Sequence, residues 1–184
     1  MITQELFQLA LHIKDPWFIS DLQFDEHTKR LDIHVDFTKG SAFTYFDETT
    51  QQEIVGLKTY DTTNKQYRHL NFFEYECYIH TRVPRVKLPD GKVKRIKTPW
   101  EGLSNGFTLL FEALLMQLCQ AMPVVKVANI VKVSDDKLWS MMERYIDTTR
   151  ECKKTEQIGH QCRFSSDTHA VSNRTVMPEM IRTL

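Results

Sequence analysis

Basic side chains gather in one short stretch of the sequence, between residues 82 and 97, where Asp90 is the only acidic residue. On a two-stranded ribbon, cations at every second position can follow a nucleic-acid backbone, and each phosphate that they neutralise makes binding more sensitive to salt. The alternative interpretation is a solvated edge hairpin whose charges prevent edge-to-edge aggregation. The candidate phosphate-binding residues are Arg82, Arg85, Lys87, Lys92, Lys94, Arg95 and Lys97.

A second set of candidates follows a helical pattern after residue 130. If the last predicted helix enters a major groove through its N-terminal part, its exposed positions contact bases or phosphates. Asp135 and Asp136 would then lie nearest the phosphates, which is electrostatically unfavourable, and two lysines offset them. A helical subdomain whose apolar faces only form its own core is the alternative. The candidates are Lys132, Lys137, Ser140 and Arg144.

Catalytic chemistry has little support in the sequence. It contains no glycine-rich phosphate loop, no nucleophile elbow and no HExxH motif. Cys77 and His80 are three residues apart, but on a strand that spacing places them on opposite faces. Further possible ligands lie near the C-terminus without the tight pair typical of zinc sites: Cys152, His160, Cys162 and His169. We therefore predict no catalytic residue, no bound metal and no cofactor.

A β-rich N-terminal part must position the basic stretch. Residues 3–13 have a helical pattern that ends before Pro16. In residues 18–37, apolar and polar residues alternate on both sides of a turn, which predicts a β-hairpin with one buried and one solvent-exposed face. Asp32 and Asp36 lie on the solvent-exposed face, and we expect both to be simply solvated. After it the sequence predicts loop with short strands at 38–66, a long strand at 72–88, a turn at 89–92 and a returning strand at 93–96.

Helical periodicity begins at residue 107. Apolar residues at spacings of three and four predict a helix that ends at Met122, a short helix after Pro123 and a third helix capped by Ser134. A long helix, a short helix and a tight link to a third helix form the helix-turn-helix plan, although many three-helix packings share it. The predicted apolar face of the third helix consists of Leu138, Trp139, Met142, Tyr145 and Ile146.

The composition is that of a folded chain without net charge. Of its 184 residues 41% are hydrophobic, and 24 basic residues balance 24 acidic ones. Residues 1–57 hold 4 Lys and Arg against 10 Asp and Glu, a net of −6, whereas residues 58–100 hold 10 against 4, a net of +6. No apolar run reaches the ~20 residues of a membrane span, and no secretory leader is visible. Four widely spaced cysteines fit a reducing cytoplasm.

Six motifs stand out along the chain: IKDPWFI at 13–19, LDIHVDF at 31–37, YRHLNFF at 67–73, RVPRV at 82–86, PW at 99–100 and GFTLLFE at 106–112. Jointly they resemble the start of transposases of the insertion-sequence "L three" family, over about residues 10 to 150. The resemblance implies an N-terminal zinc-ribbon-like module, a helix-turn-helix and then a catalytic domain of ribonuclease-H type. In that family, three acidic residues of the catalytic domain bind divalent metal and drive two-metal phosphoryl chemistry.

The sequence departs from that family pattern in two places. The cysteine pairs expected on two turns of the ribbon are absent from residues 43–48 and 87–91, so we expect packing rather than zinc to hold the module. Residues 158–161 read Ile-Gly-His-Gln, without the first catalytic carboxylate that the resemblance places there, and the chain ends at Leu184. We therefore expect a transposase portion truncated before its catalytic domain, which is not an enzyme.

The predicted fold class is α+β. An antiparallel, zinc-ribbon-like β module without its cysteines is expected over residues 1–100, a three-helix helix-turn-helix domain over 101–150 and a poorly structured tail over 151–184. The expected function is recognition of an insertion element's terminal inverted repeats in double-stranded DNA, at the bacterial nucleoid in the cytoplasm. Other expected partners are a second copy or the intact transposase, with which the fragment would compete. The alternative is a protein-interaction or relic module without DNA affinity.

Overall fold

The computed structural model describes residues 2–47, 50–104 and 106–157, and the side chains of 4–47, 50–104 and 106–150 within them. The chain divides into two compact units, Met1–Phe111 and Glu112–Leu184, named here the sheet unit and the helical unit. Residues 158–184 of the tail predicted over 151–184 lie outside the described residues. None of the described helices is both long and apolar enough to cross a membrane.

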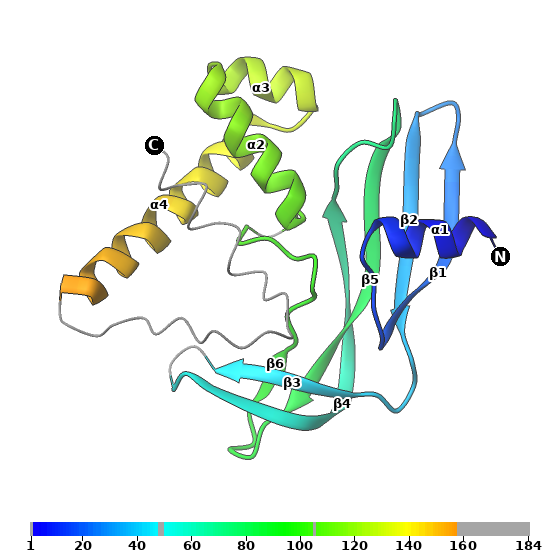
Figure 1. Ribbon diagram of the computed structural model, residues 1–184, viewed down its shortest axis with the longest axis vertical. Helices are drawn as coiled ribbons and strands as arrows, with labels where there is room; N and C mark the ends of the chain where they lie inside the picture. The colour runs from blue at the N-terminus through cyan, green and yellow to red at the C-terminus, as the bar shows by residue number, and fades with distance from the viewer. Residues whose placement is uncertain (1, 48–49, 105, 158–184) are drawn as a thin grey trace. The chain divides into compact units, whose positions relative to one another are not determined.

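The sheet unit begins with helix α1 (Ile2–Ala10), followed by strands β1 (Trp17–Asp25), β2 (Arg30–Phe37), β3 (Ala42–Asp47), β4 (Gln52–Arg68), β5 (Glu76–Lys87) and β6 (Val93–Arg95) (Figure 1). Their order in the sheet is β1-β2-β5-β4-β3, with β6 paired to β5. The predicted hairpins β1–β2 and β5–β6 are confirmed, and both are antiparallel. The predicted antiparallel pairing is confirmed for four of the five strand pairs, and β2 with β5 is the exception, because these two strands pair in parallel. The β3–β4 excursion reverses the chain between them, as a parallel pair requires.

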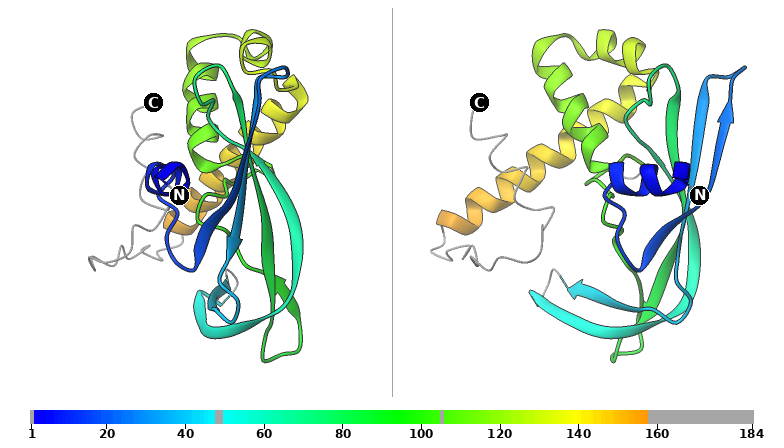
Figure 2. Two further views of the ribbon diagram at one scale, coloured as in Figure 1. Left: turned by 90° about the vertical axis from the view of Figure 1, so that its right-hand side faces the viewer. Right: turned by 45° about the vertical axis from the view of Figure 1, so that its right-hand side comes forward.

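Strand β4 corrects the prediction of a loop with short strands over residues 38–66. It is 17 residues long, pairs with β3 in its first half and with β5 in its second, and curves strongly (Figure 2). Gly56 has a φ of 76°, which favours glycine, close to where the pairing passes from one neighbour to the other. Along the second half of β4, half-buried and exposed residues alternate, but most of the residues on each face of the strand are polar. Apolar periodicity therefore could not reveal this strand.

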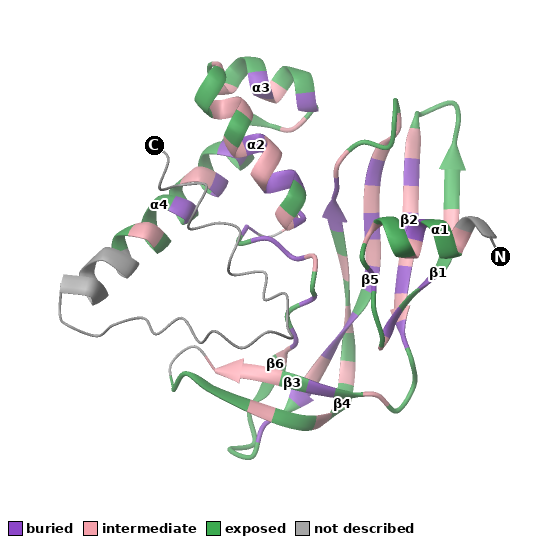
Figure 3. Cartoon of the chain, in the orientation of Figure 1, coloured by how far each residue is buried: buried purple, intermediate pink, exposed green. Residues whose placement is uncertain are grey.

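The core of the sheet unit lies on one face of the sheet. Leu31, Ile33 and Ile79 are almost fully buried in one cluster, which Tyr67 from β4 joins. Buried residues alternate with less buried ones along β2 and β5 (Figure 3). Helix α1 adds Phe7 to the same cluster, which explains why its short amphipathic sequence is helical: burial of each large apolar side chain contributes about 1.5–3 kcal/mol. The opposite face of these strands carries polar side chains, as the alternation in residues 31–37 predicted.

The helical unit and the residues leading into it form the predicted succession of three helices. These are α2 (Leu109–Ala121), α3 (Val124–Val131) and α4 (Asp135–Gln157), which with α1 make four helices among the described residues. Helix α3 begins after Pro123 as predicted and ends at Lys132, which has the left-handed conformation, with φ 54° and ψ 45°. The Ser134 carbonyl accepts hydrogen bonds from the backbone N–H groups of Lys137 and Leu138, in the first turn of α4. Helix α4 continues past residue 150 into the segment predicted as a tail.

The apolar face predicted for the third helix is partly wrong. Leu138 and Tyr145 are buried as expected, but Trp139 is 53% exposed and Ile146 is 48% exposed, whereas Met141 is fully buried. The buried stripe has spacings of three and four residues, 138–141–145, and it packs on α3. Trp139 and Ile146 each follow a stripe residue by one position, which turns their side chains about 100° away from the core.

Candidate nucleic-acid interface

The link between α3 and α4 has the geometry of a helix-turn-helix. Only Lys132, Val133 and Ser134 separate the two helices, and the N–H of Val133 donates to the Ala128 carbonyl at 3.2 Å. The left-handed Lys132 turns the chain at the end of α3, a conformation common after helix C-termini. Val127 and Val131 of α3 are buried, and α3 contacts α4. The short link and these apolar contacts fix how α4 projects from α3.

Lys137, Ser140 and Arg144 share one exposed face of α4. Their spacings of three and four residues place them one above the other, in the first half of the helix. A separate exposed face carries Trp139 and Ile146. Helix α4 therefore offers a polar face with two cations near its N-terminal end, bordered by the exposed Asp136 and Glu143, and the sequence-predicted candidates from this helix lie together on it.

A buried polar pair joins α2 to α4 within the helical unit. The hydroxyl of Tyr145 donates to Oε2 of Glu112 at 2.5 Å, and Glu112 has no exposed surface. Burial, together with the Glu112 carboxylate, raises the pKa of Tyr145, so that this hydroxyl stays protonated and keeps donating. We assign this pair to holding α4 in place, since neither group reaches the exposed basic face.

The predicted basic hairpin is less cationic in space than in sequence. Arg82 forms an ion pair with Asp36 of β2, and Arg85 forms one with Asp61 of β4. Arg95 donates two hydrogen bonds of 2.7 Å to the carboxylate of Glu101. All three carboxylates lie outside the stretch 82–97, so a count of charges along the sequence missed them. Only Asp36 belongs to residues 1–57, so the −6 balance of that segment could have signalled one of the three partners and not Asp61 or Glu101.

The lysines of the hairpin differ from its arginines. Lys92 pairs with Asp90 at 3.1 Å within the turn. Lys87, Lys94 and Lys97 are exposed, and among the described residues no ion pair involves them. These three lysines are therefore the cations of the hairpin best placed to meet a phosphate.

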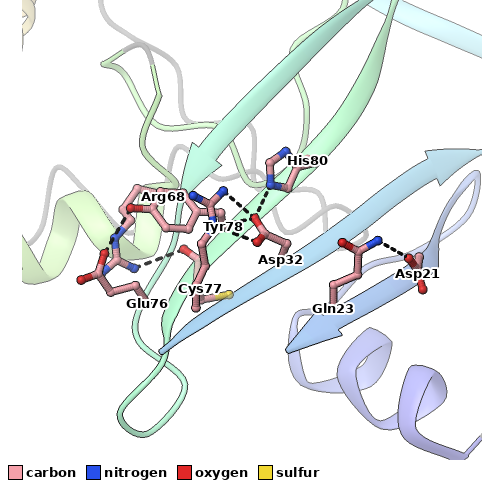
Figure 4. A network of polar contacts seen from close by, with 9 residues as sticks. Asp21, Gln23, Asp32, Arg68, Glu76, Cys77, Tyr78 and His80 are labelled. Carbon is pink, nitrogen blue, oxygen red and sulfur yellow. Dashed lines mark hydrogen bonds and ion pairs between the residues drawn. The ribbon is translucent and has the colours of Figure 1, made fainter. Parts of the chain in front are cut away.

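The polar face of the sheet contains a network that the sequence did not predict (Figure 4). Asp32 accepts hydrogen bonds from the Arg30 guanidinium and from Nε2 of His80, the latter at 2.5 Å. Burial alone would raise the pKa of Asp32, but the bonds from Arg30 and His80 outweigh it and hold the pKa below its usual value. Asp32 and Asp36 are thus ion-paired, which corrects the expectation that they are simply solvated. The rings of His34 and His80 stack with centroids 4.9 Å apart.

Arg68 and His69 form a buried structural hub at the end of β4. Arg68 donates to the carbonyls of His69 and Cys77 and to the side chain of Asn71, and its guanidinium lies over Tyr78 (Figure 4). Burial, with the nearby Arg68 charge, lowers the pKa of His69 to about 4. His69 is therefore neutral near pH 7. One of its ring nitrogens lies 2.8 Å from the Thr108 hydroxyl.

Within the described part of the chain, no group of three or more His, Cys, Asp or Glu side chains is placed to hold a metal ion. Cys77 is buried in the core, and His80 points to the polar face, as their spacing predicted. Of the other possible ligands, the side chain of Cys152 and all of His160, Cys162 and His169 lie outside the described residues.

The helical geometry defines a class of domain, the helix-turn-helix, and comparison with known families specifies which one. Residues 98–146 match the model of the helix-turn-helix domain of transposase family ISL3. This segment covers α2, α3 and the first half of α4, and it is similar to the DNA-binding domain of that transposase family. The resemblance inferred from the sequence motifs is confirmed over these residues. No curated protein and no solved structure matches the chain.

Proposed function

We propose that this chain recognises the terminal inverted repeats of an insertion element as the DNA-binding portion of an ISL3-family transposase. The observation that carries the proposal is the family match over residues 98–146, which ends within α4 just after its exposed basic face. The N-terminal half of α4 would enter the major groove, where Lys137, Ser140 and Arg144 read base edges or contact phosphates. Lys132, in the turn, would contact the backbone next to the groove.

The sheet unit would supply contacts without base specificity. Lys87, Lys94 and Lys97 would neutralise phosphates, because they are exposed and have no described ion pair. Lys92 and the three arginines would contribute less, since each must first exchange a carboxylate for a phosphate. We further propose that this unit takes the place of the family's zinc-ribbon-like module, with its apolar core in place of a metal.

The chain would bind DNA without cutting it. This part of the proposal rests on residues 158–161, where no carboxylate stands at the position of the family's first catalytic aspartate. A chain that occupies element ends without cleaving them would compete with intact transposase, and it would be found with the nucleoid in the cytoplasm.

Fluorescence anisotropy of the full chain against the element's terminal repeat and a scrambled duplex, at two salt concentrations, tests the proposal. We expect tighter and salt-sensitive binding to the repeat, because specific complexes typically exceed non-specific ones by about 10³-fold or more. Equal affinity for both duplexes would refute end recognition and leave only a generic basic surface. Absence of binding at low salt would refute DNA binding and favour the protein-interaction alternative, which the ion-paired arginines of the hairpin support.

A further inference from the structure

We infer that one end of the sheet unit is a docking surface for a basic, apolar-faced segment of a partner protein. The surface is formed by the turn after β1 and by the turn between β4 and β5, and we name it the aromatic end. Its aromatic members are Phe24, Phe72, Phe73 and Tyr75, with Phe7 of α1 beneath them. This inference does not depend on the proposed DNA-binding function.

The two turns are held side by side by direct contacts. The N–H of Glu76 donates to the Lys29 carbonyl at 2.8 Å, and Lys29 forms an ion pair with Glu74 at 2.9 Å. The ring of Phe24 lies 5.5 Å from that of Tyr75 and 6.2 Å from that of Phe72. Figure 3 shows both turns mostly in the colour of exposed residues. The aromatic rings therefore form one continuous surface rather than scattered exposed residues.

Phe73 stands at the tip of this surface in an unfavourable backbone conformation. Phe72 and Tyr75 exchange both backbone hydrogen bonds, at 3.0 and 2.9 Å, so Phe73 and Glu74 form a two-residue turn. Phe73 has a φ of 51° and is 85% exposed. Asn or Gly would suit that position better, and a bulky residue there is a genuine outlier. An exposed ring retained against the preference of the backbone points to a use outside the folded core.

The charges around the aromatic end are mainly acidic. Asp25 and Glu26 lie in the turn after β1, and Glu74 lies beside Phe73, with Lys29 as the neighbouring cation. Glu5 is exposed on α1, the helix that carries Phe7. Leu6 and Leu9 of the same helix are both well exposed. An apolar surface bordered by carboxylates complements a segment that has large apolar side chains on one side and Lys or Arg around them.

The same charges decide against other occupants. A nucleic acid would bring phosphates against these carboxylates. A two-fold dimer through this surface would place each acidic border against its own copy. A basic partner segment meets neither penalty, so it is the occupant to which the proposal commits.

A synthetic peptide tests the surface with the full chain. The probe is an amphipathic helical peptide of Leu and Lys, about 18 residues or five turns long, and its control carries Glu in place of every Lys. We expect the Leu/Lys peptide to bind at least about tenfold more tightly in fluorescence anisotropy, because its cations meet the acidic border. Equal binding of the two peptides would overturn the proposal, since mere stickiness of exposed rings would explain it.

Phe73→Asn is the variant that tests the aromatic end itself. It removes the ring and suits the left-handed backbone, so the protein should fold at least as well while peptide binding weakens about tenfold, as for a central aromatic contact. Tyr60→Asn is the matched control, because Tyr60 is an exposed aromatic residue of β4 outside this surface, 63% exposed. If both variants weaken binding equally, the proposal is wrong.

Glu26→Lys tests the acidic border, with Glu53→Lys on β4 as its control. We expect only the first to weaken binding of the Leu/Lys peptide, by roughly three- to tenfold at low salt, because Glu26 lies in the turn that borders the rings. If the chain self-associates and Phe73→Asn abolishes this self-association, the surface would instead belong to a second copy. Loss of vesicle binding on the same substitution would assign it to a membrane. Either result, without peptide binding, would refute a basic protein partner.

Discussion

The β5–β6 hairpin and helix α4 both carry cations that the sequence assigns to DNA, but the fold treats the two sets differently. On the hairpin, Arg82, Arg85 and Arg95 are engaged by carboxylates from β2, β4 and the segment after β6. On α4, Lys137 and Arg144 share an exposed face with Ser140. Basic residues that cluster along a sequence therefore form a cationic surface only where neighbouring elements bring no compensating acidic residues. A strand in the middle of a sheet has a neighbour on each side that can bring such acids, whereas Lys137, Ser140 and Arg144 lie one above the other on a single exposed helix face.

The largest expected effect concerns the packing that presents α4. Leu138→Ala should reduce the free energy of unfolding by about 2–5 kcal/mol, because it leaves a cavity at a side chain with no exposed surface. Trp139→Ala, the neighbouring residue on the exposed face, should cost less than about 1 kcal/mol. Urea denaturation of both variants measures this difference. Equal losses of unfolding free energy would mean that Trp139 belongs to the apolar face, as the sequence predicted, and that the buried stripe 138–141–145 is wrong.

A second prediction separates the stability of the two units by pH. The pKa of His69 falls to about 4 in the folded state from about 6.5 in unfolded chains, so folding favours the neutral ring. The contribution of His69 to the free energy of unfolding is fully present above pH 6.5. It is lost as the pH falls toward 4, which lowers this free energy by up to about 3 kcal/mol. In a Trp139→Phe background, tryptophan fluorescence reports only Trp17 and Trp100 of the sheet unit. Denaturation of this protein at pH 7 and pH 4.5 should show the loss.

His69→Gln serves as the control for that pH dependence. The variant removes the titrating ring, so the loss between pH 7 and pH 4.5 should shrink, even if the variant is less stable at pH 7. An unchanged pH dependence would assign the loss to other groups of the sheet unit.

The third prediction tests the exposed face of α4. The double variant Lys137→Glu, Arg144→Glu should weaken binding to the terminal repeat by at least about tenfold and flatten its salt dependence. Lys14→Glu reverses an exposed lysine of the sheet unit and should leave affinity within about twofold. The measurement is anisotropy over a series of salt concentrations. Equal effects of the two changes would mean that only net charge matters, which would remove α4 from the interface.

The smallest expected change in DNA affinity concerns the difference between the arginines and the lysines of the hairpin. Asp61→Asn releases Arg85 from its ion pair, so DNA affinity should rise by about two- to fivefold at low salt. Lys94→Gln should lower affinity more than Arg85→Gln does, because Lys94 has no described ion pair to leave. If Arg85→Gln lowers DNA affinity more than Lys94→Gln does, Arg85 readily exchanges its carboxylate for a phosphate. The ion-paired arginines and the exposed lysines of the hairpin would then not differ as proposed.

The sequence by itself determined the local elements whose patterns are strong. The alternation of residues 31–37 predicted a strand with one dry face, and the apolar spacing after residue 107, with Pro123 and Ser134 at helix starts, predicted α2, α3 and α4. These patterns suffice because a helix or a hairpin is held largely by contacts between residues close in sequence. The family resemblance came from the same residues, and it is confirmed over 98–146.

Only the tertiary structure decided what depends on contacts between distant residues. The parallel pairing of β2 with β5 and the ion pairs of Asp36 with Arg82 and Asp61 with Arg85 join residues 24 or more positions apart. The long polar strand β4 depends on pairing with two different neighbours, β3 and β5. The aromatic end, where Phe7, Phe24 and Phe72 meet, is of the same kind. A local pattern fixes which face a side chain takes on its own element, but not which neighbour that face meets. That choice follows from the packing of the whole unit, which decides whether a cation stays exposed or finds a carboxylate.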